Sequence, residues 1–181
     1  MKTSILSPQF DKDAIRIAAD LIRRGEVVGM PTETVYGLAA NALNGEAVAK
    51  IFRAKGRPQD NPLIVHIADF NQISDLCPAV PPQAVALAEA FWPGPLTMIV
   101  PKGSCIPNEV SCGLDTVGIR LPSHPLARAL IRAAGVPLAA PSANTSGRPS
   151  TTTAAHVLCD LDGKIAAILD GGPCGVGVES T

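Results

Sequence analysis

The chain has 181 residues, of which 46% are hydrophobic and only 3% are aromatic, and its net charge is −1. This length suits one domain that buries roughly 70% of the surface of the unfolded chain. The near-neutral charge disfavours a broad basic surface for nucleic acid. The N-terminal segment is too polar for a signal peptide, and no apolar run reaches the ~20 residues of a membrane span.

Helices and strands are expected to alternate along the chain. Residues 11–24 predict an amphipathic helix, and 27–30 predict a buried strand. A second helix should begin at Asn44 and end at Gly56, because asparagine caps helix N-termini and glycine caps C-termini. This alternation indicates an α/β fold with a mixed, twisted sheet. The remaining expected elements are strand 63–67, helices 71–77 and 83–91, strand 96–100, a loop over 101–115, strand 116–121, helix 125–134 capped by Ser123, strand 136–140, a helix from Thr151 or Thr152 to Leu161, and strand 164–169.

The cysteines and histidines form neither a disulfide framework nor a metal site. The odd number of cysteines, their wide spacing and the lack of a CxxC pair fit reduced thiols in the cytoplasm. The histidines show no metal-ligand spacing with them, so we expect no structural metal. These residues are Cys77, Cys105, Cys112, Cys159 and Cys174, with His66, His124 and His156.

Polar side chains gather at both ends of the stretch 31–67, around which we expect the molecule to be organised. Lys55 and Arg57 lie between a helix and a strand, where two cations on a bent backbone suit an anion. Alternatively, they only complement the helix dipole and face water. The polar run 32–36 and His66, each beside a buried strand, favour a ligand crevice.

Two later segments leave alternatives open. Arg120 lies in an apolar run, either as a water-facing arginine of an edge strand or as a buried arginine that needs an anionic partner. Loop 141–147 is rich in short hydroxyl and amide side chains, which form turns or bind phosphate and ribose. The sequence has no GxxxxGK[ST] loop and no GxGxxG motif in the required context, so we expect neither a P-loop nor a Rossmann site.

Six ordered blocks are spread along most of the chain: PTETVYGLAANA and KIFRAKGRPQDNPLIVHI within 31–67, FWPGPLT at 91–97, VGIRLPSHP at 117–125, PLAAPSANTSGRPSTT at 137–152, and GVGVEST at the C-terminus. Together they resemble the YrdC-like family of threonylcarbamoyl-adenylate synthases. The resemblance implies a single domain over 1–181. Its fold would be an open, twisted, mixed α/β sheet with flanking helices and a central positively charged cavity.

The resemblance also implies an activity. L-threonine, bicarbonate and ATP with Mg²⁺ would give threonylcarbamoyl-AMP, pyrophosphate and water, a nucleotidyl transfer. Downstream proteins of the pathway would then move the threonylcarbamoyl group to an adenosine of tRNA. Two rivals remain. One is an RNA-binding module without catalysis, contacting tRNA or double-stranded RNA, which the charge and the low aromatic content disfavour. The other is a relative that forms carbamoyl-adenylate, although such proteins carry extra domains.

Site residues follow from the same resemblance. Lys55 and Arg57 are expected to be catalytic and to face the phosphates, and Arg120 to bind the threonine carboxylate as a bidentate partner. All three should face the cavity, so that their replacement by alanine leaves the fold intact. No metal is expected on protein side chains. The expected ATP contacts are Lys55, Arg57, Asn61, Thr116, Ser142, Asn144 and Ser150. The expected threonine contacts are Thr34, His66, Arg120, Ala140 through its backbone, and Ser180.

The C-terminus departs from the family pattern. The family continues past Glu-Ser-Thr with an apolar strand and an arginine that contacts ATP, and longer members add a linker and a second domain. We therefore expect an open sheet edge near Thr181, slower adenylate synthesis than in an extended chain, and a mobile tail from Gly172, because little remains to pack the tail down.

Overall fold

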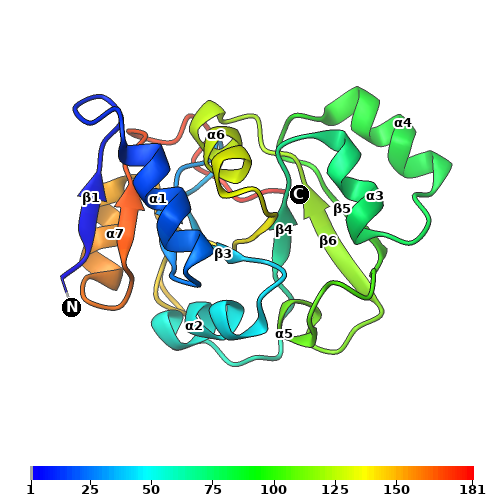
Figure 1. The fold of residues 1–181 in the computed structure, drawn as a ribbon, viewed down its shortest axis with the longest axis horizontal. Coiled ribbons are helices and arrows are strands. Elements are labelled where there is room, and N and C mark those ends of the chain that lie inside the picture. Colours follow the sequence, from blue (N-terminus) through cyan, green and yellow to red (C-terminus); the bar gives the residue numbers. More distant parts are fainter. Residues whose placement is uncertain (1) are drawn as a thin grey trace.

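One eight-stranded mixed sheet forms the centre of the molecule (Figure 1). The structure is a computed structural model and describes residues 2–181. The strands are β1 (Ser4–Leu6), β2 (Val28–Met30), β3 (Gly37–Asn41), β4 (Ile64–His66), β5 (Thr97–Pro101), β6 (Thr116–Arg120), β7 (Leu138–Ala139) and β8 (Ala167–Leu169). Their order across the sheet is β1-β8-β2-β3-β7-β4-β6-β5. Strand β8 is parallel to β1 and β2, and β4 is parallel to β6, whereas the other neighbours are antiparallel. The mixed α/β sheet predicted from the sequence is therefore confirmed.

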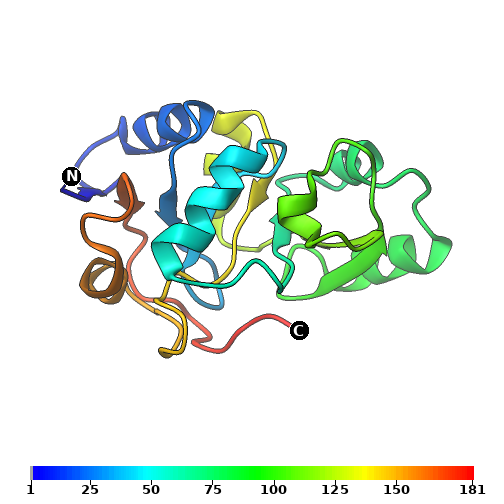
Figure 2. The same cartoon turned by 90° about the horizontal axis from the view of Figure 1, so that it is seen from below.

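Helices cover both faces of this sheet. They are α1 (Ala14–Arg23), α2 (Gly45–Lys55), α3 (Ile73–Leu76), α4 (Pro82–Phe91), α5 (Asn108–Ser111), α6 (Pro125–Ala134) and α7 (Ala154–Leu161), with a 3-10 turn at Phe70–Gln72. Helices α1 and α6 pack together on one face, and α2 and α7 pack on the other. Helices α3, α4 and α5 lie around β4, β5 and β6 at one end of the elongated molecule (Figures 1 and 2).

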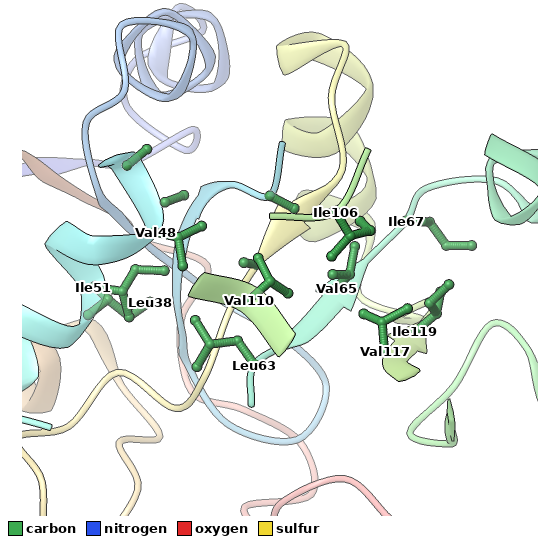
Figure 3. Packing of buried hydrophobic residues seen from close by; sticks show 14 of the residues in the cluster. Leu38, Val48, Ile51, Leu63, Val65, Ile67, Ile106, Val110, Val117 and Ile119 are labelled. Atoms are coloured by element: carbon green, nitrogen blue, oxygen red, sulfur yellow. The ribbon is translucent and has the colours of Figure 1, made fainter. Parts of the chain in front are cut away.

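Strand β3 shows how the sheet separates two cores. Leu38 points to one face and packs in a cluster with Val48 and Ile51 of α2, whereas Ala39 belongs to the cluster under α1 and α6. This alternation follows from the two-residue period of a strand. The first cluster continues to β4 and β6 through residues such as Val65 (Figure 3). This first cluster is continuous from α2 to β6, so it fixes the positions of the strand ends that carry the polar residues described below.

Helix α2 begins and ends where the sequence predicts. The Asn44 side chain accepts a hydrogen bond of 3.2 Å from the amide of Ala47, which satisfies one free donor of the first turn. Gly56 ends the helix with a φ of 61°, a left-handed conformation that glycine adopts without strain. Both caps support the predicted bounds of this helix.

Helix α6 ends at Gly135 as predicted, but its N-cap differs. The cap is His124, whose Nδ1 accepts a hydrogen bond of 3.2 Å from the amide of Leu126. Pro125 occupies the first helical position, which places residue 124 and not residue 123 at the cap. The predicted Ser123 cap is therefore wrong.

Three further features depart from the predicted elements. The sequence pattern predicts neither β1 nor β3, and the predicted loop 101–115 contains helix α5. Strand β1 has three residues and pairs with β8 near the other end of the chain. Strand β3 reads GLAAN, and glycine and alanine have low strand propensity. Its burial between β2 and β7 overrides that propensity.

The C-terminal tail crosses from the end of β8 toward β5 (Figure 2). The amides of Val176 and Gly177 donate hydrogen bonds of 2.9 Å to the carbonyls of residues 33–34. Thr181 exchanges two hydrogen bonds with residues 95 and 97 at the start of β5, one of the two edge strands of the sheet. The tail is held along its length, so the expectation that little packs it down is wrong.

Candidate active site

A cavity of about 260 Å³ opens where several segments of the chain meet. Its wall comes from the turn between β2 and β3, the loop from α2 into β4, the ends of β6 and β7, and the tail. Stretch 31–67 supplies most of this wall. The lining residues are Thr32, Thr34, Val35, Gly37, Arg57, Asn61, Pro62, Leu63, Ile64, His66, Arg120, Ala140, Pro141, Ser142, Glu179 and Ser180.

Arg120 is buried at the end of β6 and held by three acceptors. Its Nη2 lies 2.6 Å from Oε1 of Glu33 and 3.1 Å from Oγ1 of Thr34. Its Nε donates to the carbonyl of Gly94 at 3.3 Å. The side chain is 4% exposed, and β6 lies between β4 and β5. The reading of Arg120 as a water-facing residue of an edge strand is therefore wrong, and its anionic partner in this structure is Glu33.

His66 lies beside Arg120, its register partner on the neighbouring strand. The imidazole is buried and lines the cavity, and its Nδ1 has no hydrogen-bond partner within residues 2–181. Burial, followed by the charge of Arg120, lowers the pKa of His66 to about 3. The ring is therefore neutral near pH 7, with one nitrogen that accepts and one that donates.

Lys55 occupies a different place from the one expected. Its ammonium group donates to the backbone carbonyls of Ser142 and Asn144 and lies 3.3 Å from Oδ1 of Asn144. The residue is 2% exposed and does not belong to the cavity wall. The expectation that Lys55 faces the cavity is wrong here, because the carbonyls of the neighbouring loop take up the cation. Burial, followed by the charge of Arg57, lowers the pKa of Lys55 to about 8.

The loop that follows β7 is fixed from its other side by Asp160 of α7. The Asp160 carboxylate accepts hydrogen bonds from the amide of Thr145 at 3.0 Å and from Nη1 of Arg148 at 2.5 Å. Within the loop, the hydroxyl of Ser142 lies 2.6 Å from Oδ1 of Asn144. The side chain of Asn144 is therefore used inside the loop, while Ser142 reaches the cavity wall.

The other end of the cavity is more open. Arg57 is half-buried, and its guanidinium makes one hydrogen bond in the described part of the chain, to the carbonyl of Asn61 at 3.2 Å. Thr116 begins β6, so it lies about 13 Å from Arg120 at roughly 3.3 Å per residue. Ser150 lies beside Glu179 and lowers the pKa of that carboxyl group by hydrogen bonding.

The structure thus brings together most of the residues predicted for the site. The predicted residues in the cavity wall are Thr34, Arg57, Asn61, His66, Arg120, Ala140, Ser142 and Ser180. The predicted residues outside the wall are Lys55, Thr116, Asn144 and Ser150.

The charges of the cavity wall are two arginines and one carboxylate, that of Glu179. The wall therefore has a positive formal charge, although Glu33 balances Arg120 from behind. Over residues 2–181, no group of three or more His, Cys, Asp or Glu side chains is placed to hold a metal ion. No helix in that same range has the length and apolarity needed to cross a membrane.

Sequence reasoning included Glu33 in the polar run 32–36 but did not identify it as the partner of Arg120. The sequence did indicate that a buried Arg120 needs an anionic partner. It does not indicate which of the 16 acidic residues is that partner. Sequence reasoning also missed the carbonyl of Gly94. A Cβ at this position would collide with the carbonyl of Phe91, so the turn that delivers the Gly94 carbonyl to Arg120 requires glycine.

Comparisons with known proteins agree with this architecture. The Sua5/YciO/YrdC family model, described as telomere recombination, matches residues 20–181. The chain is 62% identical over 165 residues to the threonylcarbamoyl-AMP synthase of Bacillus subtilis, covering 91% of this chain and 48% of the relative. It is 56% identical over 167 residues to the enzyme of that name from Pyrococcus abyssi, covering 92% and 49%.

A solved structure gives the same result in three dimensions. The crystal structure of P. abyssi Sua5 complexed with L-threonine matches with a TM-score of 0.95 and 52% identity, covering 100% of this chain and 53% of that one. The chain therefore spans about half the length of the curated relatives that it matches. From the family match and these identities, the chain belongs to the Sua5/YciO/YrdC family.

Proposed function

We propose that this chain is a nucleotidyltransferase that makes threonylcarbamoyl-AMP from L-threonine, bicarbonate and ATP. The observation that carries the proposal is the buried Arg120 beside a neutral His66 in one cavity wall. A buried arginine with free donors suits the carboxylate of an amino acid. The relatives named threonylcarbamoyl-AMP synthase, and the relative complexed with L-threonine, support this choice of substrate.

The cavity is too small to hold both substrates completely. A volume of about 260 Å³ lies just below the roughly 300–1,000 Å³ of pockets for drug-sized ligands. It suits an amino acid with the adjoining phosphate, and the rest of the nucleotide would extend outside, toward Thr116 and Ser150. Arg57 stands where the two parts would meet and would face the phosphates.

The proposed reaction has two bond-forming steps. The amine of threonine and bicarbonate form a carbamate with loss of water. A carbamate oxygen then bonds to the α-phosphorus of ATP while the bond to the β-phosphate oxygen breaks, and pyrophosphate leaves. Mg²⁺ bound with ATP supplies charge neutralisation to the departing pyrophosphate. Glu179 is the only carboxylate among the described lining residues, so phosphate oxygens and water would provide most of the ligands, as Mg²⁺ commonly requires.

The product would pass to downstream proteins that transfer the threonylcarbamoyl group to tRNA. All five cysteines are free thiols, which fits a reducing cytoplasm, and we propose that location.

The test is pyrophosphate release together with mass spectrometry of the adenylate, using the 181-residue protein and Mg-ATP. We expect both signals only when L-threonine and bicarbonate are present together. Release with carbamoyl phosphate in place of these two substrates would instead favour a carbamoyl-adenylate enzyme. RNA binding without any pyrophosphate release would favour a binding module, and either result would overturn the proposal.

A further inference from the structure

The carboxylate of Glu33 lies behind Arg120, just outside the cavity wall. Glu33 belongs to the turn between β2 and β3, and its side chain is 15% exposed. Its Oε1 lies 2.6 Å from Nη2 of Arg120, and its Oε2 is buried without a hydrogen-bond partner in the described chain. A buried oxygen left unpaired costs free energy, so the position of this carboxylate needs an explanation.

The protein uses some of the donors of Arg120 and leaves others without a partner in the described chain. Nη2 donates to Glu33 and Thr34, and Nε donates to the carbonyl of Gly94. Within residues 2–181, no hydrogen bond involves Nη1, although Arg120 lines the cavity. The guanidinium group is planar, so fixing Nη2 and Nε also fixes the direction of both N–H bonds of Nη1.

We propose that Glu33 is a positioning residue that holds Arg120 so that Nη1 faces the carboxylate of the amino acid substrate. The inference rests on the proposed function, because it assumes that an amino acid carboxylate binds at Arg120. Without Glu33, Nη2 would keep only the neutral hydroxyl of Thr34, and the flexible side chain would lose its strongest orienting contact. A buried arginine would also lose its anion, which should lower the unfolding free energy of the Gln and Ala variants alike, whereas only Gln keeps an oxygen that orients the guanidinium.

Glu33 also makes a structural contact that does not involve its side chain. Its backbone carbonyl, with that of Thr34, receives the amides of Val176 and Gly177 in the tail that carries Ser180 to the cavity. Side-chain substitutions leave these backbone hydrogen bonds in place. They therefore separate the contact with Arg120 from the contact with the tail.

The test compares three substitutions of Glu33. Gln keeps an oxygen within reach of Nη2, Asp keeps the charge but shortens the side chain, and Ala removes both. We expect Glu33→Ala and Glu33→Asp to raise the KM for L-threonine roughly 10-fold or more, and Glu33→Gln to stay within about threefold. The kcat and the KM for ATP should change by less than about threefold in all three variants. Glu26→Ala is the matched control, because Glu26 pairs with Lys50 at the surface.

A second measurement shows whether the effect passes through the carboxylate of the substrate. Calorimetric affinity for L-threoninamide, which lacks the carboxylate, should be the same in wild type and in the Glu33 variants. If Glu33→Ala does not fold, the contrast between Gln and Asp carries the test alone.

Three outcomes would overturn the inference. The first is a change in the KM for ATP as large as the change in the KM for L-threonine. The second is a KM for L-threonine closer to wild type in the Asp variant than in the Gln variant. The third is tighter threonine binding in both the Gln and Ala variants, which would mean that Glu33 competes with the substrate for Arg120. A wild-type protein that binds L-threonine but releases no threonine-dependent pyrophosphate would contradict the proposed reaction. The affinity series for L-threonine would then still test the role of Glu33.

Discussion

The two ends of the cavity differ in how completely the protein itself satisfies their charged groups. At one end, Arg120 is buried and bonded to three acceptors, and His66 beside it is buried and neutral. At the other end, Arg57 is half-buried and bonded only to the carbonyl of Asn61 within the described residues. The first end resembles the interior of the protein, and the second resembles its surface.

This difference separates two ways of holding a substrate. A buried and already oriented arginine acts in a low dielectric, so its interaction with a ligand carboxylate is strong and its geometry is fixed in advance. A half-exposed arginine is screened by water but is free to follow a ligand that changes shape. In the proposed reaction, the amino acid keeps its carboxylate unchanged while the triphosphate is cleaved. The rigid end therefore suits the constant group, and the open end suits the group that leaves.

The largest effect should come from removing Arg120. Arg120→Met leaves the carboxylate of Glu33 buried without its partner, which typically costs about 3–5 kcal/mol of unfolding free energy. The sequence predicts that the fold survives replacement of Arg120, and the ion pair with Glu33 adds the expectation of a lower unfolding free energy. Urea unfolding measures the cost, and Arg57→Met is the control, with an expected change below about 0.5 kcal/mol. Equal losses of unfolding free energy in Arg120→Met and Arg57→Met would contradict the proposed difference between the buried and the open end of the cavity.

A smaller effect should appear in the pH dependence of stability. His66 has a folded pKa of about 3 against an ordinary 6.5, so between these values the unfolded chain binds the extra proton. Unfolding free energy therefore falls as pH decreases through this window, by about 2 kcal/mol between pH 6.5 and 5 from His66 alone. Urea titrations should show a weaker pH dependence for His66→Gln than for wild type. His156→Gln, in which an exposed histidine of α7 is replaced, should follow wild type. Identical curves for all three proteins would show that His66 is not held neutral.

The smallest effect should be local and concerns the loop beside the open end. Lys55→Met removes the donor that holds the carbonyls of Ser142 and Asn144. We expect amide exchange in residues 142–148 to accelerate about tenfold, with little change elsewhere, because Asp160 still anchors the loop. Hydrogen exchange measured by mass spectrometry reports this directly. Lys50→Met is the control, because Lys50 lies on the same helix and its ammonium pairs with Glu26 in a partly exposed contact. Unchanged exchange in the loop would mean that Lys55 is not its anchor.

Local signals in the sequence predicted the parts of the fold that depend on neighbouring residues. Helix α2 is one example, because its caps at Asn44 and Gly56 are set within a few residues of each end. The strand β1 is the opposite case, since its three residues become a strand only by pairing with β8. Strand β3 is similar, because its burial between two other strands, and not its composition, makes it extend.

In the candidate site, too, some features could be predicted from the sequence and others could not. Sequence reasoning located Arg57, His66 and Arg120 near one another, and the structure places all three in one cavity wall. It did not foresee which groups would satisfy the buried cations. The partner of Arg120 and the carbonyls that bind Lys55 both come from segments far along the chain. Satisfying a buried charge is a property of the folded interior, and no local pattern encodes the choice.

The tail has a consequence for how this wall of the cavity can change through evolution. It is attached through backbone amides, and the side chains of Val176 and Val178 are 59% and 62% exposed. Most substitutions at these two positions therefore preserve the attachment, and sequence drift there is tolerated. Proline at 176 is one exception, because it lacks the amide hydrogen that the carbonyl of Glu33 accepts. Gly177 is another sensitive position, because its φ of 76° is a left-handed conformation that strains any residue with a side chain. The wall that carries Ser180 is thus robust to side-chain changes at 176 and 178, but vulnerable to proline at 176 and to any replacement of Gly177.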